Sequence, residues 1–306
     1  MAVGTFDGVH LGHQALLGKA VDLARASAER SMQSVAITFI YPPRTVLKPQ
    51  SNFQFLSSLD DRIRLIHEQG VDVVVPVEFD HFVRALSPDE FALMLTENLR
   101  MEHFVSGPGS AVGKDRGGNR DAMENIGERL GYQVHSVSPV INNEDSVSSS
   151  LIRTALAGGR TGEVAGMLGR RYSVTGTVQT GQHRGGEIGF PTANISIGSP
   201  EYPIAIPVDG IYATWAILDD GSRKMAATSI GIRPTFDDGE ERTVEAYLLD
   251  FDSDLYTRAL SLEFVRRLRP EKKFTNVEAL VKQMEKDVEN TRIILEQDSP
   301  AVEPNR

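Results

Sequence analysis

The sequence predicts an α/β protein with two domains, the first around a parallel sheet and the second built from antiparallel strands with one terminal helix. Its 306 residues correspond to two domains at roughly 150 residues each. In the first half, short β-branched segments alternate with amphipathic segments, which is typical of βαβ units. After Gly169, alternating segments separated by turn residues favour an antiparallel barrel or sandwich. We therefore expect domains at residues 1–168 and 169–297, followed by a disordered tail at 298–306.

The first domain is expected to contain strands and helices in alternation. The strands are short and rich in β-branched residues, and they are placed at 1–6, 34–38, 71–77, 104–106 and 132–137. The helices have apolar residues three and four positions apart, and they are placed at 12–30, 59–68, 88–99, 120–130 and 149–157. Gly158 and Gly159 are suited to end the last of these helices.

The second domain is expected to be mainly β. Alternating apolar and polar residues predict strands at 172–178, 210–217, 224–230 and 243–249. One helix is expected at 276–296, where apolar residues recur at helical spacing. We expect this stripe to pack on the sheet, and it consists of Val277, Leu280, Val281, Met284, Val288 and Ile294.

Composition and charge exclude several classes of protein. With 40% hydrophobic and 24% charged residues, the chain is typical of soluble globular proteins. The absence of Cys excludes disulfides, thiolate nucleophiles and cysteine metal sites. The net charge of -10 argues against a nucleic-acid partner, although small phosphorylated ligands remain compatible with it. The sequence has no signal-peptide pattern and no long apolar run, so we expect a cytoplasmic protein without a membrane partner.

The first informative motif lies between the first strand and the first helix, in the segment GTFDGVHLGHQ. Gly4, Gly8 and Gly12 would let backbone N–H groups approach an anion, and the helix N-terminus adds its positive dipole end. His10 and His13 could both face one phosphate from the first helical turn. Two alternatives remain open at this point, namely a pair of metal ligands or two solvated histidines at a turn.

The second motif places three hydroxyl groups at the start of the helix expected at 149–157. Ser148, Ser149 and Ser150 precede Arg153, which lies one helical turn further on. Serine also caps helices in proteins without any ligand. Taken alone, the segment is therefore compatible with an ordinary N-cap and a surface arginine.

The third group of motifs lies in the second half. A glycine-rich loop from Gly181 to Gly189 precedes Pro191, Thr192 and Asn194 in the string GFPTAN, which could be an ordinary hairpin loop. Glu245 lies on an alternating strand and could be a solvent-facing acid. Arg269 and Phe274 could be a surface charge and a core aromatic residue before the last helix.

The first two motifs together resemble the nucleotidylyltransferases. FDGVHLGHQ with SSSLIR is similar to the flavin-adenylating module of the prokaryotic bifunctional riboflavin kinase/FMN adenylyltransferase (FAD synthetase) family. The resemblance implies a Rossmann-like domain in which His10, His13 and Arg153 stabilise charge on the α-phosphate of ATP while FMN attacks and pyrophosphate leaves. It also implies a set of nucleotide-binding residues, namely Gly4, Phe6, Asp7, Gly8, Gly12, Ser148, Ser149 and Ser150.

The second half resembles the riboflavin kinase module of the same family, in both GFPTAN and VEAYLLDF. This resemblance implies an antiparallel barrel in which Thr192 and Asn194 face Mg²⁺ and Glu245 is the general base. Gly181, Gly189 and Pro191 are implied to bind the nucleotide, and Arg269 and Phe274 to contact the flavin.

The resemblance implies a bifunctional enzyme that phosphorylates riboflavin to FMN and adenylates FMN to FAD, with ATP as co-substrate and Mg²⁺ as cofactor. Two departures motivate an alternative, a riboflavin kinase with a weak first domain. Gly109 replaces an acid that the family usually carries, and Met1 falls inside the first expected strand, where relatives usually carry a leading segment. A flavin-binding sensor without turnover is a further alternative, against which the intact His10, His13 and Glu245 argue.

Overall fold

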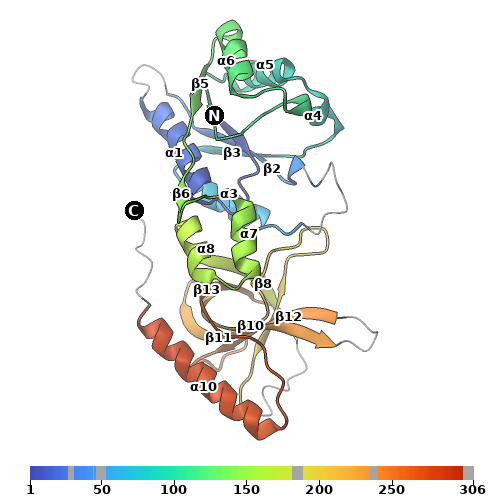
Figure 1. Cartoon of the computed structure of the whole chain (residues 1–306), viewed down its shortest axis with the longest axis vertical. Coiled ribbons are helices and arrows are strands. Elements are labelled where there is room, and N and C mark those ends of the chain that lie inside the picture. Colours follow the sequence, from blue (N-terminus) through green and yellow to red (C-terminus); the bar gives the residue numbers. More distant parts are fainter. Residues whose placement is uncertain (27–30, 44, 46–52, 181–188, 235–239, 299–306) are drawn as a thin grey trace. The chain divides into compact units, whose positions relative to one another are not determined.

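In the computed structural model, the first half of the chain folds around a five-stranded parallel sheet (Figure 1). The strand order β3-β2-β1-β4-β5 places the first strand at the centre, as in doubly wound α/β folds. The strands are β1 (Ala2–Gly4), β2 (Val35–Phe39), β3 (Val73–Val77), β4 (His103–Ser106) and β5 (Gln133–Ser136). The predicted parallel sheet is confirmed, and so is the place of each of its strands in the sequence.

The structure describes residues 1–26, 31–43, 45, 53–180, 189–234 and 240–298. These residues form two compact units, Met1–Ser149 and Ser150–Arg306, which are described separately below. The division between the units precedes the domain boundary expected at residue 168, which stays a prediction.

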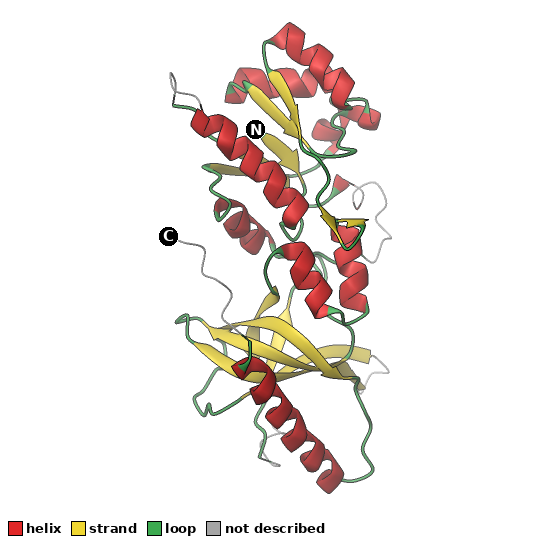
Figure 2. Ribbon diagram, turned by 60° about the vertical axis from the view of Figure 1, so that its left-hand side comes forward, coloured by secondary structure: helices red, strands yellow, loops and turns green. Residues whose placement is uncertain are grey.

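Helices cover both faces of the parallel sheet (Figure 2). Successive residues of a strand point to opposite faces. Ala2 accordingly belongs to a core cluster that includes Leu17 of α1 and Ile66 of α3, whereas Val3 belongs to a second cluster with Phe91 of α5. The helices are α1 (Leu11–Ala26), α3 (Leu59–His67), α4 (His81–Ala85), α5 (Pro88–Leu99) and α6 (Arg120–Leu130), with a 3₁₀ turn at Lys114–Arg116.

Local capping explains where the predicted helices begin. Ser87 and Glu90 form a reciprocal capping box at the start of α5, and the Asn119 side chain accepts from Ala122 N at the start of α6. The short helix α4 and the small hairpin of β6 (Ile141–Asn142) and β7 (Asp145–Ser146) were not expected, because they are too short to show a period.

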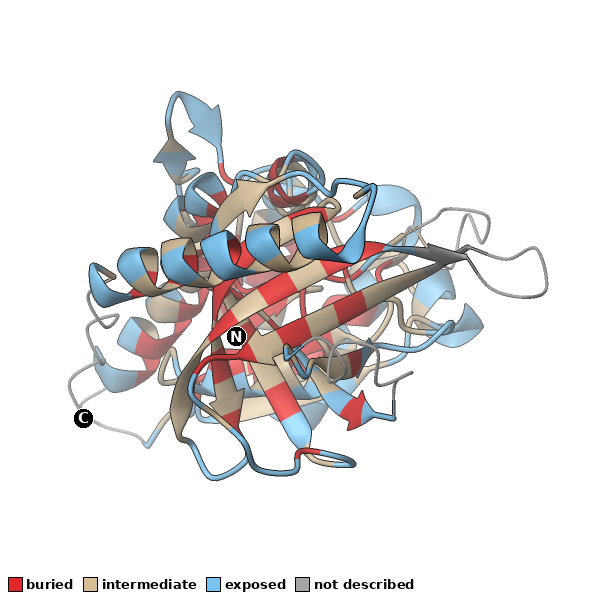
Figure 3. Ribbon diagram, turned by 90° about the horizontal axis from the view of Figure 1, so that it is seen from below, coloured by how far each residue is buried: buried red, intermediate tan, exposed pale blue. Residues whose placement is uncertain are grey.

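The second unit contains a closed antiparallel barrel with the strand order β10-β11-β12-β9-β8-β13. Buried positions recur along its strands with the alternation that one filled interior requires (Figure 3). Its strands are β8 (Tyr172–Gln179), β9 (Ala193–Ile197), β10 (Gly210–Leu218), β11 (Arg223–Pro234), β12 (Glu240–Leu248) and β13 (Ala259–Arg269). The barrel is therefore confirmed and the sandwich is excluded, while β9 and β13 were not predicted by pattern.

Three helices accompany the barrel, namely α7 (Ser149–Ala157), α8 (Thr161–Leu168) and α10 (Val277–Glu296). The last of them was predicted, and it packs on β10, β11 and β13 of the barrel as expected, although its apolar stripe is only half-buried. Val277 is 56% exposed, and the fully buried residues of α10 are Asp287, Thr291 and Leu295. The apolar stripe is instead turned partly towards a cavity, described below.

The end of α10 is fastened to the barrel. Asp298 accepts hydrogen bonds from Arg171 Nη2 at 2.6 Å and from Trp215 Nε1 at 2.8 Å. A disordered tail starting at this residue is therefore wrong for Asp298 itself, and residues 299–306 lie outside the described part of the chain. Within that described part, every helix is too short or too polar to cross a membrane.

Candidate active sites

The turn between β1 and α1 holds an uncommon backbone conformation at the carboxyl edge of the parallel sheet. Phe6 (φ 49°) and Val9 (φ 38°) are in the left-handed region that non-glycine residues seldom occupy. Gly8 (φ 78°) is required there, because a Cβ at this position would lie 2.9 Å from the Leu56 side chain. Such strain persists only where surrounding structure enforces it, and it concentrates at functional sites.

Asp7 and Ser149 fix this turn from within. The Asp7 carboxylate is buried and accepts from Leu56 N at 2.8 Å, and Ser57 Oγ accepts from Gly8 N at 3.2 Å. Ser149 Oγ donates to the Asp7 carbonyl at 3.0 Å. Ser149 of the serine segment and Asp7 of the glycine loop are 142 positions apart in the sequence, and this hydrogen bond joins the two segments.

The two histidines of the loop lie against each other. The rings of His10 and His13 stack with centroids 3.6 Å apart, and His13 N donates to His10 Nδ1 at 3.3 Å. Gly12 leaves room for this arrangement, because a Cβ there would lie 3.1 Å from His10 Cε1. The stacked pair offers ring nitrogens directly at the N-terminus of α1.

Burial lowers the pKa of His13 well below its usual 6.5, and the nearby charges of His10 and Arg62 lower this pKa further. His13 is therefore neutral at pH 7. Its Nδ1 is shielded from solvent and meets no hydrogen-bond partner among the described residues. An anion bound beside the pair would favour the protonated form, because opposite charge raises the pKa of histidine.

Arg62 is a residue of this site that the sequence analysis missed. It is fully buried on α3, and its Nη1 donates to the Phe39 carbonyl at 2.7 Å at the carboxyl end of β2. It also reaches Thr38 Oγ1 at 3.5 Å, and Thr38 donates to the Thr5 carbonyl at 3.0 Å, at the start of the loop. A charged residue among the buried positions of α3 was the available signal, because a buried arginine needs a specific reason.

The remaining predicted residues of the first half are placed less fully. Gly4 ends β1 against the Phe6 ring, 3.3 Å from a would-be Cβ. Ser148 directly precedes α7, whereas Ser150 and Arg153 lie on α7 within the second unit. The roles of these residues in nucleotide binding and catalysis stay predictions.

The second site gathers three residues from separate motifs. In the pairing of β12 with β9, Glu245 lies directly opposite Asn194, so both side chains share one face. Thr192 precedes Asn194 by two residues, and its Oγ1 donates to Glu245 Oε2 at 3.2 Å. The three oxygen-bearing side chains that the sequence singled out are thus brought together.

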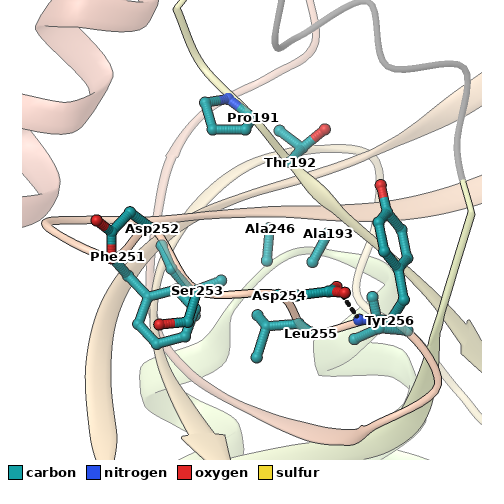
Figure 4. Close-up of a pocket in the computed structure, with 12 residues that line it drawn as sticks. Pro191, Thr192, Ala193, Ala246, Phe251, Asp252, Ser253, Asp254, Leu255 and Tyr256 are labelled. Carbon is teal, nitrogen blue, oxygen red and sulfur yellow. Dashed lines mark hydrogen bonds between the residues drawn. The ribbon is translucent and has the colours of Figure 1, made fainter.

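Two cavities meet at Thr192. The first, here called the loop cavity, has a volume of about 290 Å³ and is bounded by Pro191 and Thr192 on one side and the segment 251–256 on the other (Figure 4). Asp254 Oδ1 accepts from Tyr256 N at 2.8 Å and holds the bend of that segment. Gly189 (φ 85°) precedes this wall, whereas Gly181 and the loop through residue 188 lie outside the described residues.

The second, here called the helix cavity, has a volume of about 230 Å³ and lies between the barrel and α10. Glu245 and Thr192 line it, as do Arg269 and Phe274, so four predicted residues share its wall. Apolar side chains of α10 also contribute, which explains why the stripe on this helix is only half-buried. These are Leu280, Met284 and Val288.

Comparison with known proteins matches the two halves of the chain to two families. The FAD synthetase family matches residues 1–151, and the riboflavin kinase family matches residues 168–295. A bifunctional riboflavin kinase/FMN adenylyltransferase of Listeria monocytogenes is 34% identical over 95% of this chain and 91% of its own length. The protein of the same name from Bacillus subtilis is 33% identical over 94% and 89%.

A solved structure also covers nearly the whole chain. It is titled a macrolide-efflux protein from Streptococcus pneumoniae, and it superposes with a TM-score of 0.86 at 29% sequence identity. The match covers 95% of this chain and 93% of that one. The order of the two folds along the chain is therefore shared with a crystal structure.

Proposed function

Because the chain belongs to the family of bifunctional riboflavin kinase/FMN adenylyltransferases, we propose that it makes FMN from riboflavin and ATP, and FAD from FMN and a second ATP. The observation that carries this proposal is that Thr192 lines both cavities and donates to Glu245, which lines the helix cavity and lies opposite Asn194 in the strand pairing. A phosphoryl transfer between two small molecules needs two adjoining pockets and polar groups at their junction.

In the kinase half, the helix cavity takes riboflavin and the loop cavity takes the nucleotide. The half-buried aliphatic side chains of α10 suit the apolar plane of a flavin ring. Glu245 accepts the proton of the terminal ribityl hydroxyl as its oxygen bonds to the γ-phosphorus, while the bond to the bridging oxygen breaks and ADP leaves. General-base assistance of this kind contributes typically about 10²–10⁴-fold to the rate.

The oxygen donors at the junction fit Mg²⁺. Within the described ranges, the structure contains no group of three or more His, Asp or Glu side chains placed to hold a metal ion. Magnesium usually retains waters and is held by one or two protein oxygens together with substrate phosphates. Thr192 and Asn194 would hold the ion, with Glu245 beside them, and the ion when bound would neutralise charge on the phosphates.

In the adenylyltransferase half, the strained loop after β1 takes the phosphates of ATP. A phosphate oxygen of FMN bonds to the α-phosphorus, and the bond to the β-phosphate oxygen breaks, so that pyrophosphate leaves. The backbone of Gly12, the dipole of α1 and the His10–His13 pair supply donors and positive potential. Arg153 is assigned to the same charge, and Arg62 adds a fixed buried cation behind the loop.

The substrates of both halves are small phosphorylated molecules. We propose that the chain acts in the cytoplasm, where ATP is abundant, and that nucleic acid is not a partner because the net charge of -10 repels polyanions. The loop containing Gly109 carries no acid at that position, and Arg116 Nη2 donates to its carbonyl at 2.7 Å. The proposal therefore assigns adenylylation to residues outside this position.

The test is a time course with the purified chain, riboflavin, ATP and Mg²⁺, in which flavins are separated by HPLC. We expect FMN to appear first and FAD to follow. FMN without FAD above a His10→Ala/His13→Ala control would refute the adenylyltransferase half. Flavin binding without ATP consumption would refute both activities.

A further inference from the structure

The terminal helix α10 carries an acid at a position where an apolar residue is expected. Asp287 lies between Met284 and Val288, both of which line the helix cavity, yet its side chain is only 6% exposed. Aspartate is almost never buried to this extent unless it is paired, because burial removes the hydration of its charge. A specific partner must therefore account for this acid.

That partner is Arg269, at the end of β13. Its Nε lies 3.0 Å from both carboxylate oxygens of Asp287, and its Nη2 lies 2.6 Å from Oδ2. Gln283 Nε2 donates to the same carboxylate at 3.0 Å, one turn earlier on the helix. The Arg269 side chain is 19% exposed, and its guanidinium is held in a two-point geometry that a lysine could not reproduce.

The ion pair leaves part of the guanidinium available. Arginine has five N–H donors, of which two bond Asp287 and one on Nη1 bonds the Pro270 carbonyl at 3.0 Å. One N–H on each terminal nitrogen has no partner among the described residues. Arg269 lines the helix cavity, and its guanidinium carbon lies 5.8 Å from the centre of the Phe274 ring on the same wall.

We propose that Asp287 is a positioning residue for the kinase half, which clamps Arg269 so that its two remaining N–H groups donate to the carbonyl and ring-nitrogen acceptors of riboflavin. A two-donor edge suits neighbouring acceptors on a planar ring better than a mobile single charge does. The inference rests on the proposed function, because it takes the helix cavity as the flavin site. It assigns Asp287 an effect on flavin binding and none on phosphoryl transfer.

The experiment compares Asp287→Asn and Arg269→Lys with the unaltered chain. Riboflavin Kd is measured from the change in flavin fluorescence without ATP, and kcat and the KM for ATP are measured from FMN formation. We expect either substitution to raise the riboflavin Kd by about tenfold or more, as loss of a charged hydrogen bond does. The kcat and the KM for ATP should change less than about threefold, and Glu289→Gln, an exposed acid on the same helix, should change nothing.

A double variant separates positioning from a direct effect. If Asp287 acts through Arg269, Asp287→Asn combined with Arg269→Lys should bind riboflavin about as weakly as the weaker single variant. If the riboflavin Kd of the double variant rose by the product of the two single increases, the proposal would be overturned. An unchanged riboflavin Kd in the single variants, or a loss confined to kcat, would also overturn it. FAD formation from supplied FMN should stay constant throughout and reports that the first unit remains folded.

A pair replacement covers the case in which Asp287→Asn does not fold. Asp287→Leu with Arg269→Met removes both charges and leaves neither buried alone, a change that proteins often tolerate. We expect this variant to bind riboflavin at least about tenfold more weakly, and binding as tight as that of the unaltered chain would overturn the proposal. If the unaltered chain neither binds riboflavin nor forms FMN, the proposed function fails instead.

Discussion

Replacing the carboxylate of Glu245 tests the assignment on which the kinase half depends. In Glu245→Gln the side chain keeps its shape, and its amide oxygen can still accept the 3.2 Å hydrogen bond from Thr192 Oγ1. The pairing of β12 with β9 at Asn194 involves the backbone and is unaffected. The substitution therefore removes the proton acceptor and little else, with a stability cost of about 1 kcal/mol from the weaker hydrogen bond.

The expected loss follows from the role of a general base. Such a base contributes about 10²–10⁴-fold, which corresponds to about 3–5 kcal/mol of transition-state stabilisation at 1.36 kcal/mol per factor of ten. The kcat for FMN formation should fall by this factor, while the KM for ATP should change little because the loop cavity is intact. Both parameters are obtained by HPLC of flavins at varied ATP and saturating riboflavin.

The same chain supplies the control, because we assign FAD formation from supplied FMN to residues other than Glu245, so this activity should be unchanged. Glu285→Gln, an exposed acid on α10, serves as the matched substitution and should retain full FMN formation. A fall of less than tenfold in kcat would show that Glu245 is an ordinary solvent-facing acid. Equal loss of FMN formation and FAD formation would contradict the assignment of the two activities to separate sites.

Three further predictions use other parts of the chain. Arg153→Ala should lower FAD formation from FMN by about 10²-fold or more and leave FMN formation unchanged, as HPLC would show, and equal losses would contradict its assignment. The pKa of His13 in the folded chain is well below 6.5, so on acidification His13 is protonated in the unfolded chain before it is protonated in the folded chain. The unaltered chain should therefore lose up to about 1.4 kcal/mol of unfolding free energy per pH unit below pH 6.5, and His13→Asn should lose less in urea titrations at pH 7 and 5.5. Thr291→Val should raise the unfolding free energy by about 1 kcal/mol, since the buried hydroxyl of Thr291 has no partner among the described residues. Thr214→Val should lower the unfolding free energy by about 1–3 kcal/mol, because it breaks the 2.7 Å hydrogen bond to Thr228. If both variants changed the unfolding free energy in the same direction, the hydrogen-bond argument would be refuted.

Much of the fold could be predicted because its local signals agree with its packing. The helices at Pro88–Leu99 and Arg120–Leu130 have the predicted bounds, since a capping side chain and an apolar face mark the same residues. Strand β9 escaped prediction because it is short and includes Asn194 and Ser196, and its pairing with β8 and β12 holds it in the barrel. Strand β13 does carry alternating buried residues, so its pattern was available.

The site could be predicted only in part, because its parts meet through strand register and long-range pairs. Glu245 and Asn194 were each visible in the sequence, but their contact depends on how β12 pairs with β9. The apolar stripe of α10 was assigned to the core because periodicity does not distinguish a core from a cavity wall. Asp287 was missed because its partner, Arg269, lies on a strand 18 residues earlier, and the sequence does not show that the two side chains meet.

The distribution of acids between the two sites follows from the two nucleophiles. A ribityl hydroxyl keeps its proton at pH 7 and needs a base in the transition state, and we assign that role to Glu245, which lines the helix cavity. A phosphate monoester is already largely ionised at pH 7, because its second pKa is about 6, so its attack on ATP needs no base. The single acid of the GTFDGVHLGHQ segment, Asp7, accordingly accepts from Leu56 N outside the segment, whereas we assign hydrogen-bond donation to the phosphates to the His10–His13 pair and a fixed positive charge to Arg62. A carboxylate facing the α-phosphate would repel both reactants, so its placement inside the loop is what the adenylylation chemistry requires.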